Sequence, residues 1–177
     1  REAAAYLVCE ALEWQFVPLT VFRTEGLPMG PGSLQIYVEH NPDDHYLNQA
    51  DVYRQFLPKV TAFDLLINNA DRKGGHLLLD PEGKLWLIDH GLSFHPEDKL
   101  RTVVWDCAGD PIPELLLGDI EHLHAQLLAG DMINICKPIY PHRKLKTSSI
   151  ELLCYWLKVI SPSHLKIAGL TPGRWYN

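Results

Sequence analysis

The sequence predicts an α+β fold that is mainly helical and contains one small antiparallel hairpin. Apolar residues recur at helical spacing over residues 2–13, 49–68 and 113–128. Between the second and third of these helices, two short apolar runs flank a four-residue turn, which is the pattern of a hairpin. With 177 residues, 46% hydrophobic and 21% charged, the chain has the composition of an ordinary globular protein of one domain or slightly more.

The hairpin is predicted by its turn residues. Its two strands and the turn between them are expected over residues 76–80, 84–89 and 80–83. Pro81 suits the turn position that needs a φ of about −65°, and Gly83 suits the position that needs a positive φ. Because an antiparallel hairpin brings its open ends together, we expect His76 and Asp89 to meet in space, with Asp71 one short loop away.

The remaining elements follow from local patterns. We expect a strand over residues 16–22, in which Pro18 implies an edge strand or the entry to a strand, a loop over 26–32, a buried strand over 33–39 and a tail helix over 148–160. The loop has no Gly-x-Gly-x-x-Gly pattern and no following lysine, which argues against a phosphate cradle. Pro58 should kink or split the helix over 49–68. The predicted core positions of the second and third helices are Val52, Phe56, Val60, Phe63, Leu66 and Ile67, then Leu115, Leu116, Ile120, Leu123, Leu127 and Leu128.

Composition narrows the class of protein. No apolar run reaches the roughly 18 residues of a membrane span, and no signal peptide is visible. The four cysteines, Cys9, Cys107, Cys136 and Cys154, are far apart, which argues against a zinc module or a disulfide framework and for buried thiols in a reducing compartment. A cytoplasmic protein is therefore expected. The chain begins at Arg1 inside a predicted helix, from which we expect its N-terminal part to be missing.

Charge divides the chain near residue 131. Residues 132–177 hold seven Lys or Arg and one acid, a net charge of +6, so residues 1–131 carry −12 against the total of −6. We therefore expect a globular region over 1–131 and a basic C-terminal extension over 132–177. The extension fits a solvated basic face, and recruitment to an anionic membrane is the alternative.

Asp71 is the first candidate for catalysis. It lies between Asn69 and a Lys-Gly-Gly loop, where a carboxylate can accept a proton from a substrate hydroxyl. Capping of the loop's backbone N–H groups is the alternative. The neighbouring Arg72 and Lys73 could neutralise the charge of a phosphate, or simply be solvated.

Asp89 is the candidate metal ligand. It closes an apolar strand, where an unpaired carboxylate is costly and a metal ion or another cation would satisfy it. A structural salt bridge is the alternative. His76 should lie beside it, but Mg²⁺ prefers oxygen ligands, so the imidazole could instead bond a phosphate or Asp89 itself. We interpret the other histidines nearby in the sequence as surface residues or as supports behind the site; these are His90, His95, His122 and His124.

These motifs together resemble the catalytic and metal-binding loops of the phosphatidylinositol 3-/4-kinase superfamily. Residues 71–76 (Asp-Arg-Lys-Gly-Gly-His) resemble its Asp-Arg-x-x-x-Asn loop, and residues 88–91 (Ile-Asp-His-Gly) resemble its Ile-Asp-x-Gly equivalent of the protein-kinase Asp-Phe-Gly motif. The type II phosphatidylinositol 4-kinase branch and its bacterial relatives also carry a Glu-Ala-rich helix, a Val-Pro-x-Thr strand and a Gly-Ser-x-Gln-x-x-Val-Glu segment. Here these are residues 1–8, 17–20 and 32–39, in the same order, so the similarity covers about residues 1–110.

The resemblance implies a protein-kinase-like C-lobe with its hinge over residues 1–131, the N-lobe being largely missing. It makes Asp71 the catalytic-loop aspartate and Asp89 the metal-binding aspartate, with His76 in the place of the metal-binding asparagine. It also implies nucleotide-binding residues in the hinge, which are Gln35, Tyr37, Val38 and Glu39, with Val38 offering backbone groups to adenine. Glu2 is implied to be the helix acid that pairs with the ATP-binding lysine. The glycine-rich loop and that lysine belong upstream of Arg1, so the chain as written is expected to bind nucleotide poorly.

Three functions are consistent with these residues. The first is an ATP- and divalent-metal-dependent phosphotransferase that uses Mg²⁺ or Mn²⁺ and passes the γ-phosphoryl group to a hydroxyl of a lipid headgroup or a protein. The second is a nucleotide-binding pseudokinase or scaffold, favoured if His76 does not support a metal. The third is a metal-dependent phosphoesterase with Asp71, His76 and Asp89 as ligands. The expected partners are a nucleotide and a hydroxyl acceptor, and not nucleic acid.

Overall fold

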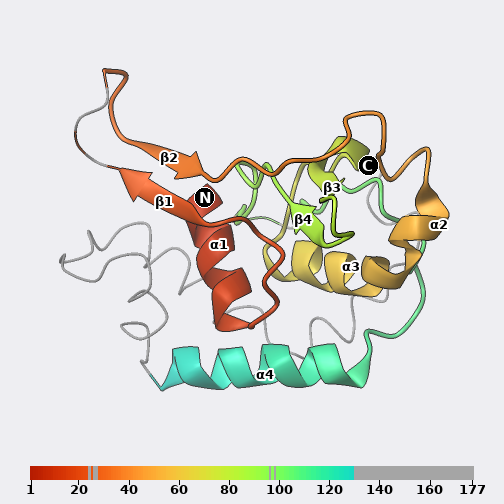
Figure 1. The fold of residues 1–177 in the computed structure, drawn as a ribbon. Coiled ribbons are helices and arrows are strands. Elements are labelled where there is room, and N and C mark those ends of the chain that lie inside the picture. Colours follow the sequence, from red (N-terminus) through yellow and green to blue (C-terminus); the bar gives the residue numbers. More distant parts are fainter. Residues whose placement is uncertain (24, 26–27, 96, 98, 130–177) are drawn as a thin grey trace.

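The computed structural model describes residues 1–129 except 24, 26–27, 96 and 98, so the predicted tail helix over 148–160 lies outside the described residues. Figure 1 shows helices and two separate two-stranded antiparallel sheets, β1–β2 and β3–β4, which confirms the predicted α+β class. The elements, with the 3-10 helices named η, run in the order α1 (Glu2–Ala11), β1 (Thr20–Arg23), β2 (Gly32–Gln35), α2 (Ala50–Tyr53), η1 (Arg54–Phe56), α3 (Leu57–Leu66), η2 (Gly74–His76), β3 (Leu77–Leu79), β4 (Leu85–Leu87) and α4 (Glu114–Leu128).

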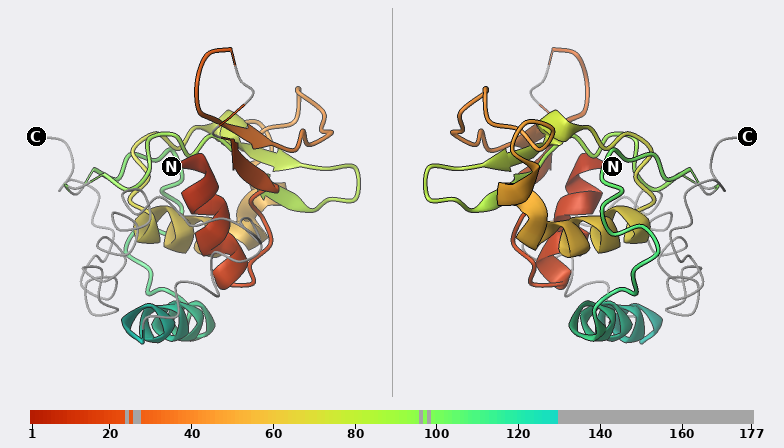
Figure 2. Two further views of the ribbon diagram at one scale, coloured as in Figure 1. Left: turned by 90° about the vertical axis from the view of Figure 1, so that its left-hand side faces the viewer. Right: turned by 90° about the vertical axis from the view of Figure 1, so that its right-hand side faces the viewer.

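One apolar core joins the three longer helices. In Figures 1 and 2, α4 runs beneath both α1 and α3. Buried side chains from each helix, among them Val8, Phe63 and Leu123, belong to the same cluster. Between α1 and β1, Trp14 donates its indole N–H to Asp119 Oδ2 at 2.8 Å, which fixes α4 against the rest of the molecule. Within the described residues, no helix is both long enough and apolar enough to cross a membrane.

The predicted hairpin is confirmed. Strands β3 and β4 pair in the register Leu77↔Leu87, Leu78↔Trp86 and Leu79↔Leu85. Asp80 closes the turn, because its Oδ1 accepts the backbone N–H groups of Glu82 and Lys84 at 3.1 and 2.8 Å. Leu77 and Leu87 are fully buried, so one face of the hairpin packs on the core and fixes the register at the end that carries the site.

The predicted helix over 49–68 is divided, as Pro58 suggested. The chain forms α2, then one turn of 3-10 helix in η1, and Pro58 stands in the first turn of α3, where its missing N–H costs nothing. The division also changes which side chains of this segment are buried. Val60 and Phe63 are fully buried as expected, but Val52, also expected in the core, is 47% exposed.

Three other expectations are corrected. The strand over 33–39 is neither complete nor buried, because β2 ends at Gln35, and Leu34, Ile36 and Tyr37 are exposed. The sheet has two strands, and exposed side chains occur on both of its faces, Phe22 on one and Leu34 on the other. The strand over 16–22 begins at Thr20, since Pro18 has no N–H to donate and the Phe16 carbonyl accepts the Leu87 N–H at 2.7 Å. Two expected core positions of α4, Leu115 and Leu128, lie on its exposed side.

Substitutions at two glycines, one in the hairpin turn and one in α4, test the backbone conformation at those positions. Gly83 has a φ of +78°, whereas Gly118 lies inside α4, and a Cβ at either position would meet no atom within 4 Å. We expect Gly83→Ala to lower the free energy of unfolding by about 1–2 kcal/mol, because a Cβ is disfavoured at positive φ. Gly118→Ala should raise it by about 0.5–1 kcal/mol through helix propensity. Urea denaturation measures both values, and a Gly83→Ala variant as stable as the parent would contradict the turn.

Candidate active site

The candidate site lies at the open end of the β3–β4 hairpin, where two loops meet. One loop follows α3 and carries residues 67–73; the other follows β4 and carries residues 88–91. Backbone bonds hold them together, with the Ile88 N–H donating to the His76 carbonyl at 3.1 Å and the Ala70 N–H to the Leu92 carbonyl at 3.3 Å. The prediction that His76 and Asp89 meet is confirmed, with His76 Nε2 3.2 Å from Asp89 Oδ2.

Arg72 forms a buried ion pair that joins the first loop to α3. Its Nε lies 2.8 Å from Asp64 Oδ2 and its Nη2 lies 2.8 Å from Asp64 Oδ1, with the two side chains 0% and 2% exposed. Its Nη1 also donates to the Ile88 carbonyl at 3.0 Å. This bidentate arrangement is the strong form of a charge-assisted hydrogen bond. Arg72 therefore connects α3, its own loop and the loop after β4.

This placement fits neither alternative given for Arg72, which were to neutralise a phosphate or to be solvated. A guanidinium without exposed surface and with its donors already bound has no access to a ligand, so its role is to position the loops. Sequence reasoning missed Asp64. The available signal was a single acid among the apolar residues 60–67, because a carboxylate there needs a buried partner.

Asp71 is held through its backbone while its carboxylate stays accessible. The Asp71 N–H donates to Asn69 Oδ1 at 3.1 Å, and Asn69 Nδ2 donates in turn to Asp64 Oδ1 at 2.9 Å. Asp71 Oδ2 accepts from Lys73 Nζ at 2.8 Å, with side chains 35% and 60% exposed. The hydrogen bond from Lys73 lowers the pKa of Asp71 below its usual value, so this contact favours the ionised carboxylate.

Asp89 and His76 form the other half of the site. The Asp89 side chain is 54% exposed and that of His76 is 11% exposed. Burial lowers the pKa of His76 below its usual value, although Asp89 opposes this shift. Asp89 has a φ of +59°, an uncommon conformation for a residue with a side chain. A strained backbone position is a recurrent feature of functional sites.

Asp71 and Asp89 both affect the pKa values of Lys73 and His76. Both Asp71 and Asp89 raise the pKa of Lys73, Asp71 more strongly because it accepts the Lys73 hydrogen bond. Both also oppose the lowering of the His76 pKa by burial. That Asp71 and Asp89 face a shared volume stays a prediction.

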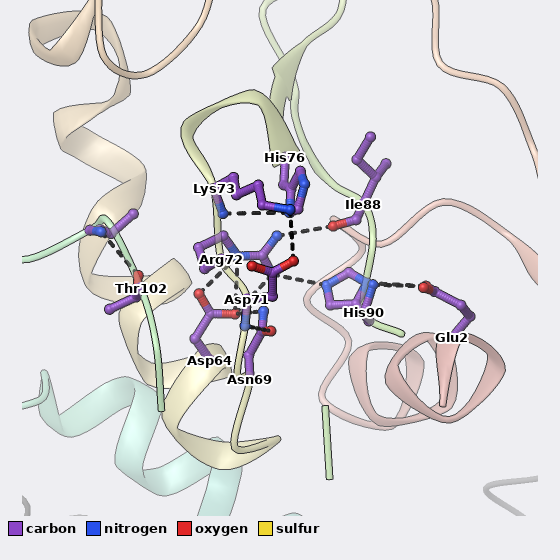
Figure 3. Close-up of polar contacts among 11 residues, drawn as sticks. Glu2, Asp64, Asn69, Asp71, Arg72, Lys73, His76, Ile88, His90 and Thr102 are labelled. Carbon is purple, nitrogen blue, oxygen red and sulfur yellow. Dashed lines mark hydrogen bonds and ion pairs between the residues drawn. The ribbon is translucent and has the colours of Figure 1, made fainter. Parts of the chain in front are cut away.

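A buried polar chain connects this region to α1 (Figure 3). The Glu2 carboxylate accepts the backbone N–H of His90 at 2.9 Å, and Arg72 Nη2 donates to His90 Nε2 at 3.0 Å. His90 is fully buried and its ring meets Phe63 edge-on at 5.8 Å. Burial lowers the pKa of His90 well below its usual value, and Arg72 adds to the effect, so the ring is neutral. His90 was expected to be either a surface residue or a support behind the site, and the structure shows the second, because its side chain is fully buried.

Glu2 reaches the loop after β4 from the start of α1. Burial raises the pKa of its carboxyl above the usual value, while the His90 N–H opposes the shift. A Cβ on Gly91 would lie 3.2 Å from Glu2 Oε1, so the glycine allows this close approach. The structure thus places Glu2 beside the segment that contains Asp89.

The hinge residues expected to bind nucleotide lie along the segment that leaves β2. Gln35 Nε2 donates to Thr20 Oγ1 at 2.8 Å, His40 Nδ1 lies 2.9 Å from the Val38 carbonyl, and Tyr37 is 80% exposed. Glu39 is also exposed. In the described part of the chain, no hydrogen bond or ion pair joins residues 35–39 to Asp71 or Asp89.

Asp89 supplies one oxygen donor of the kind that binds Mg²⁺. Among the described residues, no group of three or more His, Cys, Asp or Glu side chains converges as a metal site. The exposed carboxylate of Asp89 is nevertheless the oxygen donor that Mg²⁺ prefers. Mg²⁺ is commonly held by one or two carboxylates, with substrate phosphates and waters completing its shell.

Two comparisons with known proteins identify what this chain is similar to. The family model described as "Phosphatidylinositol 3- and 4-kinase" matches residues 1–117, which include both loops. Protein Rv2133c of Mycobacterium tuberculosis is 37% identical over 169 residues, a match that covers 75% of this chain and 59% of that protein. The chain thus spans about three-fifths of the length of this curated relative. Since the family model covers well over half of its residues, the chain belongs to the phosphatidylinositol 3- and 4-kinase family.

Proposed function

We propose that the protein is an ATP- and divalent-metal-dependent phosphotransferase that passes the γ-phosphoryl group of ATP to a hydroxyl of a lipid headgroup or a protein. Family membership points to a kinase-like function. The observation that supports the finer proposal is the pair of contacts at the open end of the hairpin, one between Asp71 and Lys73 and the other between Asp89 and His76. Within the family, the type II phosphatidylinositol 4-kinase branch and its bacterial relatives remain the proposed placement.

The proposed roles of the site residues follow from how exposed their side chains are. Asp71 accepts the proton of the attacking hydroxyl, since its carboxylate is ionised and partly exposed. Asp89 holds the metal ion, Mg²⁺ or Mn²⁺, which when bound would neutralise charge on the phosphates. Lys73, 60% exposed, is the cation able to contact the transferred group. Arg72 binds no ligand and keeps the two loops in place.

The nucleotide is proposed to lie between the hinge and the loop after β4. Residues 35–39 would contact the adenine ring, with Val38 using its backbone. Glu2 already approaches the segment that contains Asp89, which suits an acid that pairs with an ATP-binding lysine. A kinase-like C-lobe over residues 1–131 and a location in the cytoplasm remain part of the same proposal.

Calorimetry of ATP binding to the full-length protein tests the proposal. We expect ATP to bind in the presence of Mg²⁺ or Mn²⁺ and more weakly without them. Asp89→Asn should reduce the affinity for ATP in the presence of metal by more than 100-fold. A loss of roughly 10-fold to 100-fold is typical when a residue that only hydrogen-bonds a metal ligand is replaced, and Asp89 is proposed to be the ligand itself. The matched control is Asp51→Asn, which alters an exposed surface ion pair with Arg54 and should leave ATP binding unchanged.

Other outcomes assign the protein to the alternatives. Equal ATP affinity with and without metal would favour a nucleotide-binding pseudokinase. Metal binding that needs no nucleotide, together with hydrolysis of a phosphoester by water, would favour a phosphoesterase. Either result contradicts the proposed phosphotransferase.

A further inference from the structure

Both ring nitrogens of His76 have partners in the structure. Nε2 lies 3.2 Å from Asp89 Oδ2. Nδ1 lies 3.5 Å from the backbone nitrogen of Lys73 (Figure 3). The same two residues are also joined through their backbones, since the His76 N–H donates to the Lys73 carbonyl at 3.1 Å. The ring is 11% exposed, so these two contacts define most of its polar surroundings.

The partner of Nδ1 determines which nitrogen carries the proton. A backbone N–H only donates, so the Nδ1 that faces Lys73 must be the acceptor. A neutral imidazole has one donor and one acceptor, and its proton therefore lies on Nε2. Nε2 in turn faces a carboxylate oxygen, which only accepts. The two contacts independently select the same tautomer.

A metal-binding histidine needs the opposite arrangement. When one ring nitrogen binds a metal, the other carries the proton and donates it to a carboxylate, a carbonyl or water. If Nε2 of His76 bound a metal, Nδ1–H would face the Lys73 N–H, which places two donors against each other.

We propose that His76 is a positioning residue that donates its Nε2 proton to Asp89 Oδ2, and that it is not a metal ligand. Given the proposed function, the donated bond fixes one oxygen of a half-exposed carboxylate and leaves Oδ1 for the metal ion. The position that the family fills with a ligating asparagine thus holds a hydrogen-bond donor. Among the described residues, Asp89 would then hold the metal ion that accompanies the nucleotide, and residue 76 would supply no oxygen donor to a second one.

Nitrogen-15 NMR of the full-length, metal-free protein tests the tautomer without reference to nucleotide or activity. We expect the His76 ring to show a protonated Nε2 and an unprotonated Nδ1, with His76→Gln used to assign the signal. A protonated Nδ1 would overturn the proposal. Because this measurement uses the wild-type protein, no folding defect of a variant can obscure it.

Electron spin-echo spectroscopy with Mn²⁺ and ATP tests the absence of a nitrogen ligand. We expect no modulation from a directly bound imidazole nitrogen. Such modulation in the wild type, lost in His76→Asn and kept in the control His122→Asn at an exposed position of α4, would overturn the proposal. If Mn²⁺ and ATP do not bind at all, the proposed phosphotransferase fails, while the tautomer and its hydrogen bond are still decided by NMR.

Affinity measurements separate a hydrogen-bond donor from a residue that matters only for packing. His76→Ala should weaken Mn²⁺ binding in the presence of ATP by about 10-fold to 100-fold. His76→Gln, whose amide can present an N–H in place of Nε2–H, should recover most of that loss. Equal losses in the alanine and glutamine variants, with both proteins folded by circular dichroism, would contradict the donor role.

Discussion

Replacing Asp71 by asparagine is expected to slow phosphoryl transfer by the full-length protein about 10²-fold to 10⁴-fold, the usual contribution of a positioned general base. The amide keeps the size of the side chain but cannot take the proton of the acceptor hydroxyl. A coupled assay of ADP release, with ATP affinity measured in parallel, would show the loss in kcat.

Stability should change little in the same variant. The ion pair between Asp71 and Lys73 is largely exposed, and exposed pairs contribute about 0–1 kcal/mol. The backbone bond from Asp71 to Asn69 does not involve the carboxylate and persists. The surface variant Asp51→Asn is again the matched control and should turn over normally. Transfer at the wild-type rate in a folded Asp71→Asn protein would refute the assignment of Asp71 as the base.

Replacing Asp64 by alanine is expected to lower the free energy of unfolding by about 3–5 kcal/mol. The change leaves the guanidinium of Arg72 buried without a counterion, and it removes the partner of Asn69 Nδ2. A loss of this size is a large part of the stability of a typical domain. Urea denaturation of the two proteins would measure it.

The control for this prediction is the exposed pair of Arg54 and Asp51. Its Nη2–Oδ1 distance of 2.7 Å is similar to that of the buried pair, but its side chains are 77% and 89% exposed. Asp51→Ala should therefore cost at most about 1 kcal/mol. Similar losses for Asp64→Ala and Asp51→Ala would show that Arg72 and Asp64 do not form the buried pair.

A double replacement separates stability from function. Asp64→Leu combined with Arg72→Met removes both buried charges and should recover much of the stability lost in Asp64→Ala. It should not recover phosphoryl transfer, because the double variant lacks the donors that Arg72 gives to the Ile88 carbonyl and to His90.

The sequence alone determined the features that depend on a few neighbouring residues. The turn over 80–83 defined the hairpin, its register followed from the buried face, and the meeting of His76 with Asp89 followed from the register. Pro58 similarly defined where the second helix divides. A proline or a positive-φ glycine restricts the backbone wherever the rest of the chain lies, so these predictions needed no knowledge of tertiary contacts.

Only the tertiary structure decided how polar side chains are distributed between the site and its supports. Arg72 and His90 are buried because α3, α1 and the loop after β4 close over them, and His76 is a donor because its other nitrogen faces the Lys73 N–H. The exposed face of β2 likewise depends on which segments cover the sheet. Whether a charge faces solvent or a buried partner depends on segments far apart in the sequence, such as Glu2 and His90, and local patterns do not encode those contacts.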